Sequence, residues 1–163
     1  MMEINDPATL AEVTAAFERY EVALTGNDVE TLDELFLPSA QTIRYGITEN
    51  LYGIEAIRAF RKARPSQGLA RSLENTVITS YGRDMAIAAT LFRRTSAPGR
   101  IGRQMQTWVR MPEGWRVVRT SDATLLRVEA RGGGKAKGLA TCDLIIPGNC
   151  GPATQEEIGR AHV

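Results

Sequence analysis

Residues 70–94 read ARSLENTVITSYGRDMAIAATLFRR. Two runs of strand-forming residues, 70–81 and 85–94, stand on either side of Gly82-Arg83-Asp84, which is typical of a turn. The helical spacing of apolar residues seen earlier in the chain ends near residue 70. The stretch therefore predicts two consecutive strands joined by a short connection.

The residues after this stretch continue the strand pattern. A loop at Pro98-Gly99 precedes an alternating run at 103–111, and Pro112-Glu113-Gly114 separates that run from a last long strand at 115–126. Long strands that follow helices and are joined by short loops predict an α+β fold rather than βαβ units. A strongly curved sheet wrapped on the helices would form a cone with a pocket inside.

Three helices are predicted before residue 70. The first begins at Asp6-Pro7, where Asp can cap the helix and Pro suits its first turn, and it ends at Gly26. Asp28 caps the second helix, which we expect to end at Pro38. The other elements expected here are strands at 42–45 and 51–52 and a helix at 54–63.

Length and composition limit the possible functions. The chain has 163 residues, 43% of them hydrophobic, and a formal net charge of +1. The charge balance predicts no strong attraction to nucleic acid or membranes. The N-terminus lacks the basic and apolar segments of a signal peptide, so we expect a cytoplasmic protein. We expect one domain at 1–130 and a Gly-rich C-terminal extension at 131–163, flexible or laid over the surface.

Histidine and cysteine are too scarce for several kinds of site. The two cysteines, Cys142 and Cys150, make neither a zinc site nor a disulfide framework. The only histidine, His162, is the penultimate residue, which is a poor position for a Ser-His-Asp or Cys-His mechanism. We therefore expect no metal, and any chemistry has to use Tyr, Arg, Lys, carboxylates or backbone groups.

Several segments together resemble a known family. They are EVTAAFERYE at 12–21, TIRYGITENLYG at 42–53, IEAIRAFRKARP at 54–65, RQMQTWVR at 103–110 and EGWRVV at 113–118. In combination, over roughly residues 7–118, these segments resemble the AtzH-like family. That family belongs to the nuclear transport factor 2-like (SnoaL-like) superfamily.

The resemblance implies both a fold and a reaction. The fold is a cone-shaped α+β domain, usually dimeric, with three N-terminal helices packed on a curved, mostly antiparallel sheet and a pocket between the first helix and the sheet. Family members are typically encoded beside amidase-signature hydrolases, which implies a functional link to such an enzyme. The implied reaction converts 1,3-dicarboxyurea to allophanate in the breakdown of cyanuric acid, after s-triazine herbicides such as atrazine. It requires no cofactor.

The sequence departs from the family pattern in one place. Relatives commonly follow the Gly-Trp-Arg-Val-Val segment with two small residues and His-Val-Ser, whereas this chain has Arg119-Thr120-Ser121-Asp122 there and a long tail beyond. A role of that histidine in relatives cannot be transferred to this chain.

Arg44 lies within the short strand expected at 42–45. A strand that follows the helices lines the pocket of a cone, and an arginine is costly to bury there unless it meets an anion. One interpretation is that its planar guanidinium binds a substrate carboxylate. The other is that Arg44 pairs with an internal carboxylate such as Glu49.

Tyr20 falls on the apolar stripe of the first helix, one turn after Phe17. It is either a core tyrosine that donates to a backbone carbonyl, or a proton donor or acceptor in the pocket. A neighbouring arginine would favour phenolate and lower the pKa of the hydroxyl from its usual value near 10. A Tyr-Arg pair could therefore perform acid-base work without a histidine.

Other candidates for the site are substrate-binding residues. Arg71 could hold a second carboxylate, or it could be a solvated charge on a strand. Tyr52 and Trp108 could form pocket walls, whereas Tyr45 should point away from Arg44 because neighbouring strand residues face opposite sides. Gln104, Gln106 and Trp108 share one strand face, which suits a urea-like amide if it is concave and a dimer interface if it is convex.

Two functions follow from these residues and the resemblance. The first is a small amidohydrolase that converts 1,3-dicarboxyurea to allophanate, with Arg44 binding a carboxylate and Tyr20 transferring the proton. The second is a non-catalytic module that binds a ligand or serves a partner amidase, since fold alone does not fix function. In both cases we expect a homodimer formed through the outer face of the sheet.

Overall fold

The computed structural model of this chain describes residues 2–125. Within that range it contains three helices and six strands, and the predicted strands 70–81, 85–94, 103–111 and 115–126 are all present to within two residues at either end. The C-terminal extension predicted at 131–163 lies outside the described residues.

One sheet contains all six strands, in the order β2-β1-β6-β5-β4-β3. Neighbouring strands run antiparallel except β1 and β6, which are parallel. The sheet is thus mostly antiparallel, as predicted, and β1 lies between β2 and β6. The strands are β1 (Ile43–Tyr45), β2 (Asn50–Tyr52), β3 (Arg71–Tyr81), β4 (Met85–Arg94), β5 (Ile101–Met111) and β6 (Gly114–Leu125).

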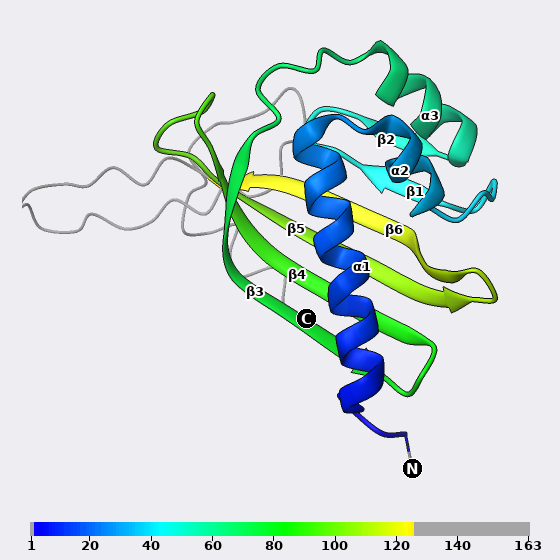
Figure 1. The fold of residues 1–163 in the computed structure, drawn as a ribbon. Coiled ribbons are helices and arrows are strands. Elements are labelled where there is room, and N and C mark those ends of the chain that lie inside the picture. Colours follow the sequence, from blue (N-terminus) through cyan, green and yellow to red (C-terminus); the bar gives the residue numbers. More distant parts are fainter. Residues whose placement is uncertain (1, 126–163) are drawn as a thin grey trace, which may run out of the picture. The chain divides into compact units, whose positions relative to one another are not determined.

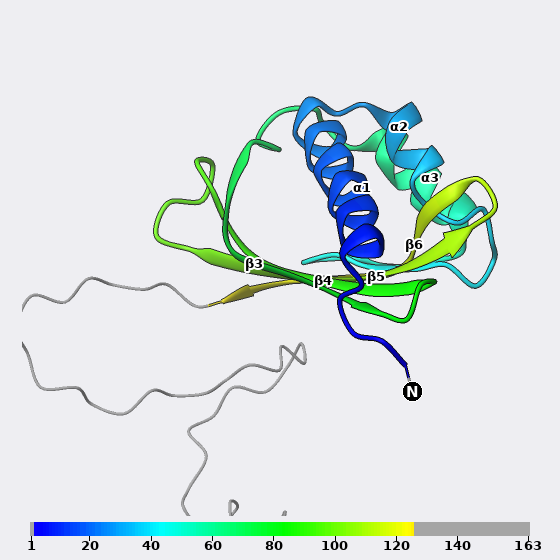
Figure 2. The same cartoon turned by 60° about the horizontal axis from the view of Figure 1, so that its bottom comes forward.

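The three helices lie on one side of the sheet, which bends around α1 (Figures 1 and 2). Irregular pairing between Glu74 and Val77 and between Thr107 and Trp108 interrupts two of the strand ladders. Such bulges bend the strand that carries them and increase its twist. The helices are α1 (Pro7–Gly26), α2 (Val29–Glu34) and α3 (Ile54–Ala63).

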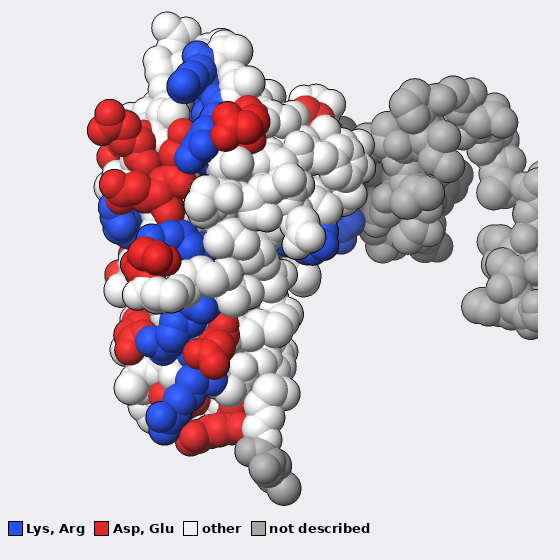
Figure 3. Space-filling view, turned by 90° about the vertical axis from the view of Figure 1, so that its right-hand side faces the viewer, with Lys and Arg blue, Asp and Glu red and all other residues white. Residues whose placement is uncertain are grey.

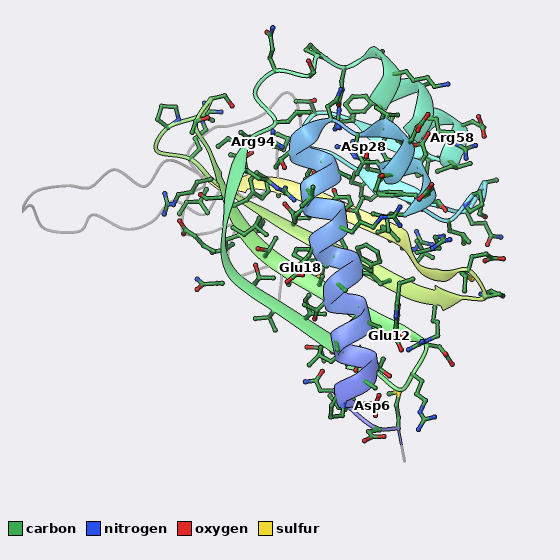
Figure 4. The ribbon with its side chains drawn as sticks, in the orientation of Figure 1. Asp6, Glu12, Glu18, Asp28, Arg58 and Arg94 are labelled. Atoms are coloured by element: carbon green, nitrogen blue, oxygen red, sulfur yellow. The ribbon has the colours of Figure 1, made fainter. Side chains whose placement is uncertain are left out.

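Aspartate caps begin the first two helices, as predicted. Asp6 accepts a hydrogen bond from the backbone N–H of Thr9 at 2.8 Å, and Asp28 accepts one from that of Thr31 at 3.0 Å. Figure 4 shows the two caps at opposite ends of α1. These bonds satisfy backbone donors that a helix start leaves without partners.

The predicted end of the second helix at Pro38 is wrong. The helix ends at Glu34, because the next residues form an extended segment that pairs with β6. The backbone N–H of Leu37 donates to the carbonyl of Val117 at 3.0 Å, and that of Val117 donates to Leu35 at 2.8 Å. Tertiary pairing overrides the helical pattern here, and it places Phe36 in the core.

The core fills the space between α1 and the concave face of the sheet. Its largest fully buried side chains include Trp108, Phe36, Leu32, Ile57 and Val13. Because β5 alternates, Gln104, Gln106 and Trp108 all point into this interior and are buried. These three residues therefore lie on the concave face of the sheet and not on the convex one, a choice that the sequence alternation left open.

The outer face of the sheet carries apolar side chains that the domain itself leaves uncovered. Val77, Met85 and Met105 are exposed there, and a hollow of about 490 Å³ is lined by Ala89, Leu91 and Met105 among others. On the side of the molecule drawn in Figure 3, charged residues of both signs gather along one edge and the rest is largely uncharged. Of the helices described, none has the length and apolar character needed to span a bilayer.

We propose that the outer face pairs with a second copy of the chain. Light scattering at micromolar protein should then give twice the chain mass, and Met105→Glu should shift the protein to monomer, because it buries a charge in the interface. Val22→Glu is the control, since Val22 is also an exposed apolar residue but lies on α1. A monomeric parent protein would contradict the prediction.

Candidate active site

Arg44 points from β1 into the interior, where its side chain is 12% exposed. Its Nη1 contacts the carboxylate of Glu49, its Nη2 lies 3.8 Å from Oδ2 of Asp122, and its guanidinium is 4.9 Å from the centre of the Phe60 ring. Arg44 thus has an internal partner in Glu49, as the second interpretation from the sequence predicted. Nη2 is beyond hydrogen-bond range of Asp122 and can still donate to a ligand.

The turn between β1 and β2 brings the Glu49 carboxylate close to the backbone of Gly46. A side chain at Gly46 would collide with this carboxylate, because a Cβ there would lie 1.9 Å from Oε1 of Glu49. Burial raises the pKa of Glu49, but hydrogen bonds from Arg44 and Thr48 and the charge of Arg44 outweigh it and hold the pKa below its usual value. Glu49 is therefore ionised and fixes the orientation of Arg44.

Tyr20 extends from α1 to the same interior and is 3% exposed. Its ring meets Trp108 edge-on at 6.3 Å between centroids, and Nε2 of Gln104 donates to its hydroxyl at 3.4 Å. Since the hydroxyl accepts this bond, its own hydrogen can be donated to another group. Tyr20 can therefore act as a proton donor.

The predicted lowering of the Tyr20 pKa is wrong. Burial raises the pKa of the hydroxyl, the negative charges of Asp122 and Glu21 add to that effect, and together they outweigh the opposing charges of Arg71 and Arg44. Desolvation disfavours the phenolate more strongly than the arginines favour it. Tyr20 is consequently a neutral phenol at pH 7, which suits a general acid and not a base.

Asp122 is a functional candidate that the sequence analysis missed. It is an inward-facing residue of β6, opposite Gln104 on β5, and Nε2 of Gln104 donates to its Oδ1 at 2.6 Å. Burial raises the pKa of Asp122, against the lowering effects of Gln104, Arg44 and Arg71. Strand alternation could have indicated that Asp122 faces inward, but only if the bulge in the β5-β6 ladder had been known. Without the bulge, Thr120 and Asp122 would be expected on the face opposite to the buried Val117.

Tyr20 and Arg44 belong to one polar network, although they do not touch. The network runs from Tyr20 to Gln104 at 3.4 Å, from Gln104 to Asp122 at 2.6 Å and from Asp122 to Arg44 at 3.8 Å. Helix α1 and strands β1, β5 and β6 each contribute one residue to it. The fold thus brings the two predicted catalytic residues into one site, joined by two residues that the sequence analysis did not assign to catalysis.

Arg71 is part of this network and is not a solvated strand charge. Its side chain has 0% exposure, and its Nε and Nη2 bind the carboxylate of Glu21 on α1. Nη2 also donates to Oε1 of Gln104 at 3.0 Å. The third nitrogen, Nη1, is buried and has no hydrogen-bond partner within residues 2–125.

Gln106 and Trp108 lie deeper in the interior, and Nε1 of Trp108 donates to Oε1 of Gln106 at 3.2 Å. The prediction that Tyr52 lines the pocket is wrong: Tyr52 is 62% exposed and its hydroxyl lies 3.3 Å from that of Tyr45 on the other face of the sheet. In β2 it is Leu51 that pairs with Arg44 and packs against the core. Among residues 2–125 no three His, Cys, Asp or Glu side chains group as metal ligands would.

A family model named AtzH-like matches residues 2–126. The chain belongs to the AtzH-like family. A crystal structure of a protein of unknown function from Pectobacterium atrosepticum is 63% identical, with a TM-score of 0.74, and the match covers 76% of this chain and 95% of that one. No curated protein matches the chain.

Two further solved structures show which fold this AtzH-like chain has. A cystatin-like fold protein from Burkholderia xenovorans is 42% identical, with a TM-score of 0.73, over 77% of this chain and 98% of that one. An NTF2-like protein of unknown function from Pseudomonas putida is 16% identical, with a TM-score of 0.64, over 85% of this chain and 100% of that one. The fold is therefore the predicted nuclear transport factor 2-like fold.

The raised pKa of Asp122 predicts a pH-dependent stability difference. Between the unfolded pKa, near 3.8, and the raised pKa of the folded state, the folded protein retains a proton on Asp122 that the unfolded protein loses, so over that range this residue destabilises the fold increasingly as pH rises. Asp122→Asn removes that effect. The melting temperature of Asp122→Asn minus that of the parent, measured by circular dichroism, should therefore be larger at pH 7 than at pH 4.

The exposed Asp84→Asn substitution is the matched control, because it removes one carboxylate outside the network. If the difference between Asp122→Asn and the parent stays constant over this pH range, or falls, Asp122 does not retain a proton in the folded protein.

Proposed function

We propose that this AtzH-like protein is a hydrolase of C–N bonds that converts 1,3-dicarboxyurea to allophanate in cyanuric acid catabolism. The observation that carries the proposal is the neutral, buried hydroxyl of Tyr20, which accepts from Gln104 and so keeps its own proton for donation. Family membership supports the choice of substrate, and the proton donor supports the choice of reaction.

The proposed reaction removes one N-carboxyl group. The C–N bond to that carboxyl carbon breaks, its electron pair stays on nitrogen, and the nitrogen takes a proton from Tyr20. The carboxyl carbon departs as carbon dioxide, or as bicarbonate when water adds to it, and allophanate remains. Protonating the departing nitrogen is the step that a general acid accelerates.

Arg44 is the proposed carboxylate-binding group. Its Nη1 is occupied by Glu49, which holds the guanidinium plane in place, and Nη2 can donate to the substrate. A carboxylate bound there gains a charge-assisted hydrogen bond in a poorly solvated site. The phenolate left on Tyr20 after transfer lies within the electrostatic reach of Arg71 and Arg44, which lower its free energy until solvent returns the proton.

A second candidate function, binding without turnover, is favoured by two observations. Arg44 pairs with Glu49 and Tyr20 is almost fully buried, as in a site built for binding or structure. The chain would then bind a ligand, or serve a partner amidase, without turnover. Product analysis with freshly made 1,3-dicarboxyurea, corrected for spontaneous loss of carbon dioxide and run with and without an amidase, separates the two functions.

Tyr20→Phe tests the proton donor. It keeps the ring and its packing against Trp108 but removes the hydroxyl, so the protein should fold and turnover should fall by roughly 10²-fold or more. Tyr45→Phe is the matched control, since Tyr45 lies on the opposite face of the sheet and should keep the parent rate. A well-folded Tyr20→Phe protein with the parent rate would exclude this role.

Arg44 is tested by two replacements. Arg44→Lys keeps the charge but loses the planar fork, and should mainly raise KM. Arg44→Gln should weaken binding more, and because it also leaves Glu49 without its partner, Arg44→Gln combined with Glu49→Gln is the balanced form of the test. If the balanced double variant retains the parent kcat/KM, Arg44 does not bind substrate.

A further inference from the structure

A hollow of about 430 Å³ opens at the end of the sheet, between the start of β3, the end of β4 and the loop at residues 95–100. Arg71 and Arg94, which are direct cross-strand partners, both line it. Figure 4 shows Arg94 at this end of the sheet. Like charges directly opposite each other in a sheet destabilise it unless another group compensates them.

The two guanidinium groups are fixed against one aromatic ring. The guanidinium carbon of Arg71 lies 4.7 Å from the centroid of Phe92, and that of Arg94 lies 5.4 Å from it. Gly102 leaves the space for this ring, because a Cβ there would lie 2.1 Å from the nearest ring atom. The arrangement holds the two cations in place before any ligand arrives, which reduces the entropy that binding would cost.

Each of the two arginines keeps a buried donor without a partner within residues 2–125: Nη1 of Arg71 and Nε of Arg94. Glu21 and Gln104 occupy the other nitrogens of Arg71, and Nη1 of Arg94 donates to the carbonyl of Gly68 at 3.0 Å. Buried donors of this kind are rare in folded proteins and are costly when they are charged. A ligand with acceptor oxygens would satisfy both.

The charges around the hollow are of one sign. Arg93 and Arg100 also line it, and no acidic residue of the described part of the chain does. Arg93 is paired with Glu74, whereas burial and the nearby charge of Arg71 lower the pKa of Arg94. An anion bound in the hollow would supply a negative charge and so stabilise the charged form of Arg94.

We propose that this hollow is a second anion-binding subsite, in which Arg71 Nη1 and Arg94 Nε bind the carboxylate of a small dianion. Only the identity of that dianion, a urea with a carboxylate at each end, rests on the proposed function. Arg71, which lines the hollow, is linked to the site already described by hydrogen bonds, because it donates to Gln104 and Gln104 donates to Tyr20.

Binding is tested without turnover by using malonate, a stable dicarboxylate, and malonamide, its uncharged counterpart. Isothermal titration should give millimolar or tighter binding of malonate and none of malonamide. Arg94→Gln should weaken malonate binding by about 10-fold, because a charge-assisted hydrogen bond is lost. Arg83→Gln removes one exposed positive charge from the turn between β3 and β4 and should leave the affinity within about twofold.

The same titration followed by amide NMR locates the ligand. Malonate should shift the backbone amides of residues 94–100 in the parent protein, and Arg94→Gln should need about 10-fold more malonate for the same shifts. Equal affinity of malonate for Arg94→Gln and Arg83→Gln, or shifts confined to residues 44–49, would overturn the subsite.

The subsite and the proposed function fail in different ways. If malonate binds as predicted and 1,3-dicarboxyurea is not turned over, the subsite stands and the reaction is wrong. If 1,3-dicarboxyurea is turned over and Arg94→Gln leaves both its KM and malonate binding unchanged, the reaction stands and the subsite is wrong.

Discussion

The side-chain amide of Gln104 is the interaction on which the site depends. Its nitrogen donates to both Tyr20 and Asp122, and its oxygen accepts from Arg71. A neutral group with both donors and acceptors can join a carboxyl group, a guanidinium and a phenol without adding a charge to a buried region. Loss of the Gln104 amide would leave three buried polar groups short of a partner, which costs far more free energy than the loss of one exposed hydrogen bond.

The fold supplies this amide with partners from elements that are distant in the sequence. Tyr20 comes from α1 and Asp122 from the last strand, and the bulge between Thr107 and Trp108 sets the register that aligns Asp122 with Gln104. Arg44 enters through the parallel pairing of β1 with β6, which puts it opposite Thr120. The sheet therefore has to bend and close on α1 before the site exists, and the chemistry depends on tertiary structure throughout.

Much of the fold could be predicted from the sequence, because turn residues and hydrophobic period mark where elements begin and end. The caps Asp6 and Asp28 and the turn at Gly82 were local signals of this kind. The end of α2 was not, because residues 36 and 37 pair with β6. For the site, residue type indicated Tyr20 and Arg44, but alternation alone could not say that Tyr52 faces outward or that Asp122 faces in. The raised pKa of Tyr20 was missed since burial, which only the structure gives, outweighs the arginines.

The proposed role of Tyr20 as a neutral proton donor can be tested directly, because the ionisation of its hydroxyl can be measured. The chain has four tyrosines, so labelling their ring carbons with 13C at the Cζ position gives few resonances, and Tyr20→Phe assigns the one of interest. The account predicts that Tyr20 keeps the chemical shift of a phenol as pH is raised past 10, the usual tyrosine pKa, in a protein that circular dichroism shows to be folded. A resonance that moves to the phenolate position at or below the usual tyrosine range would contradict it.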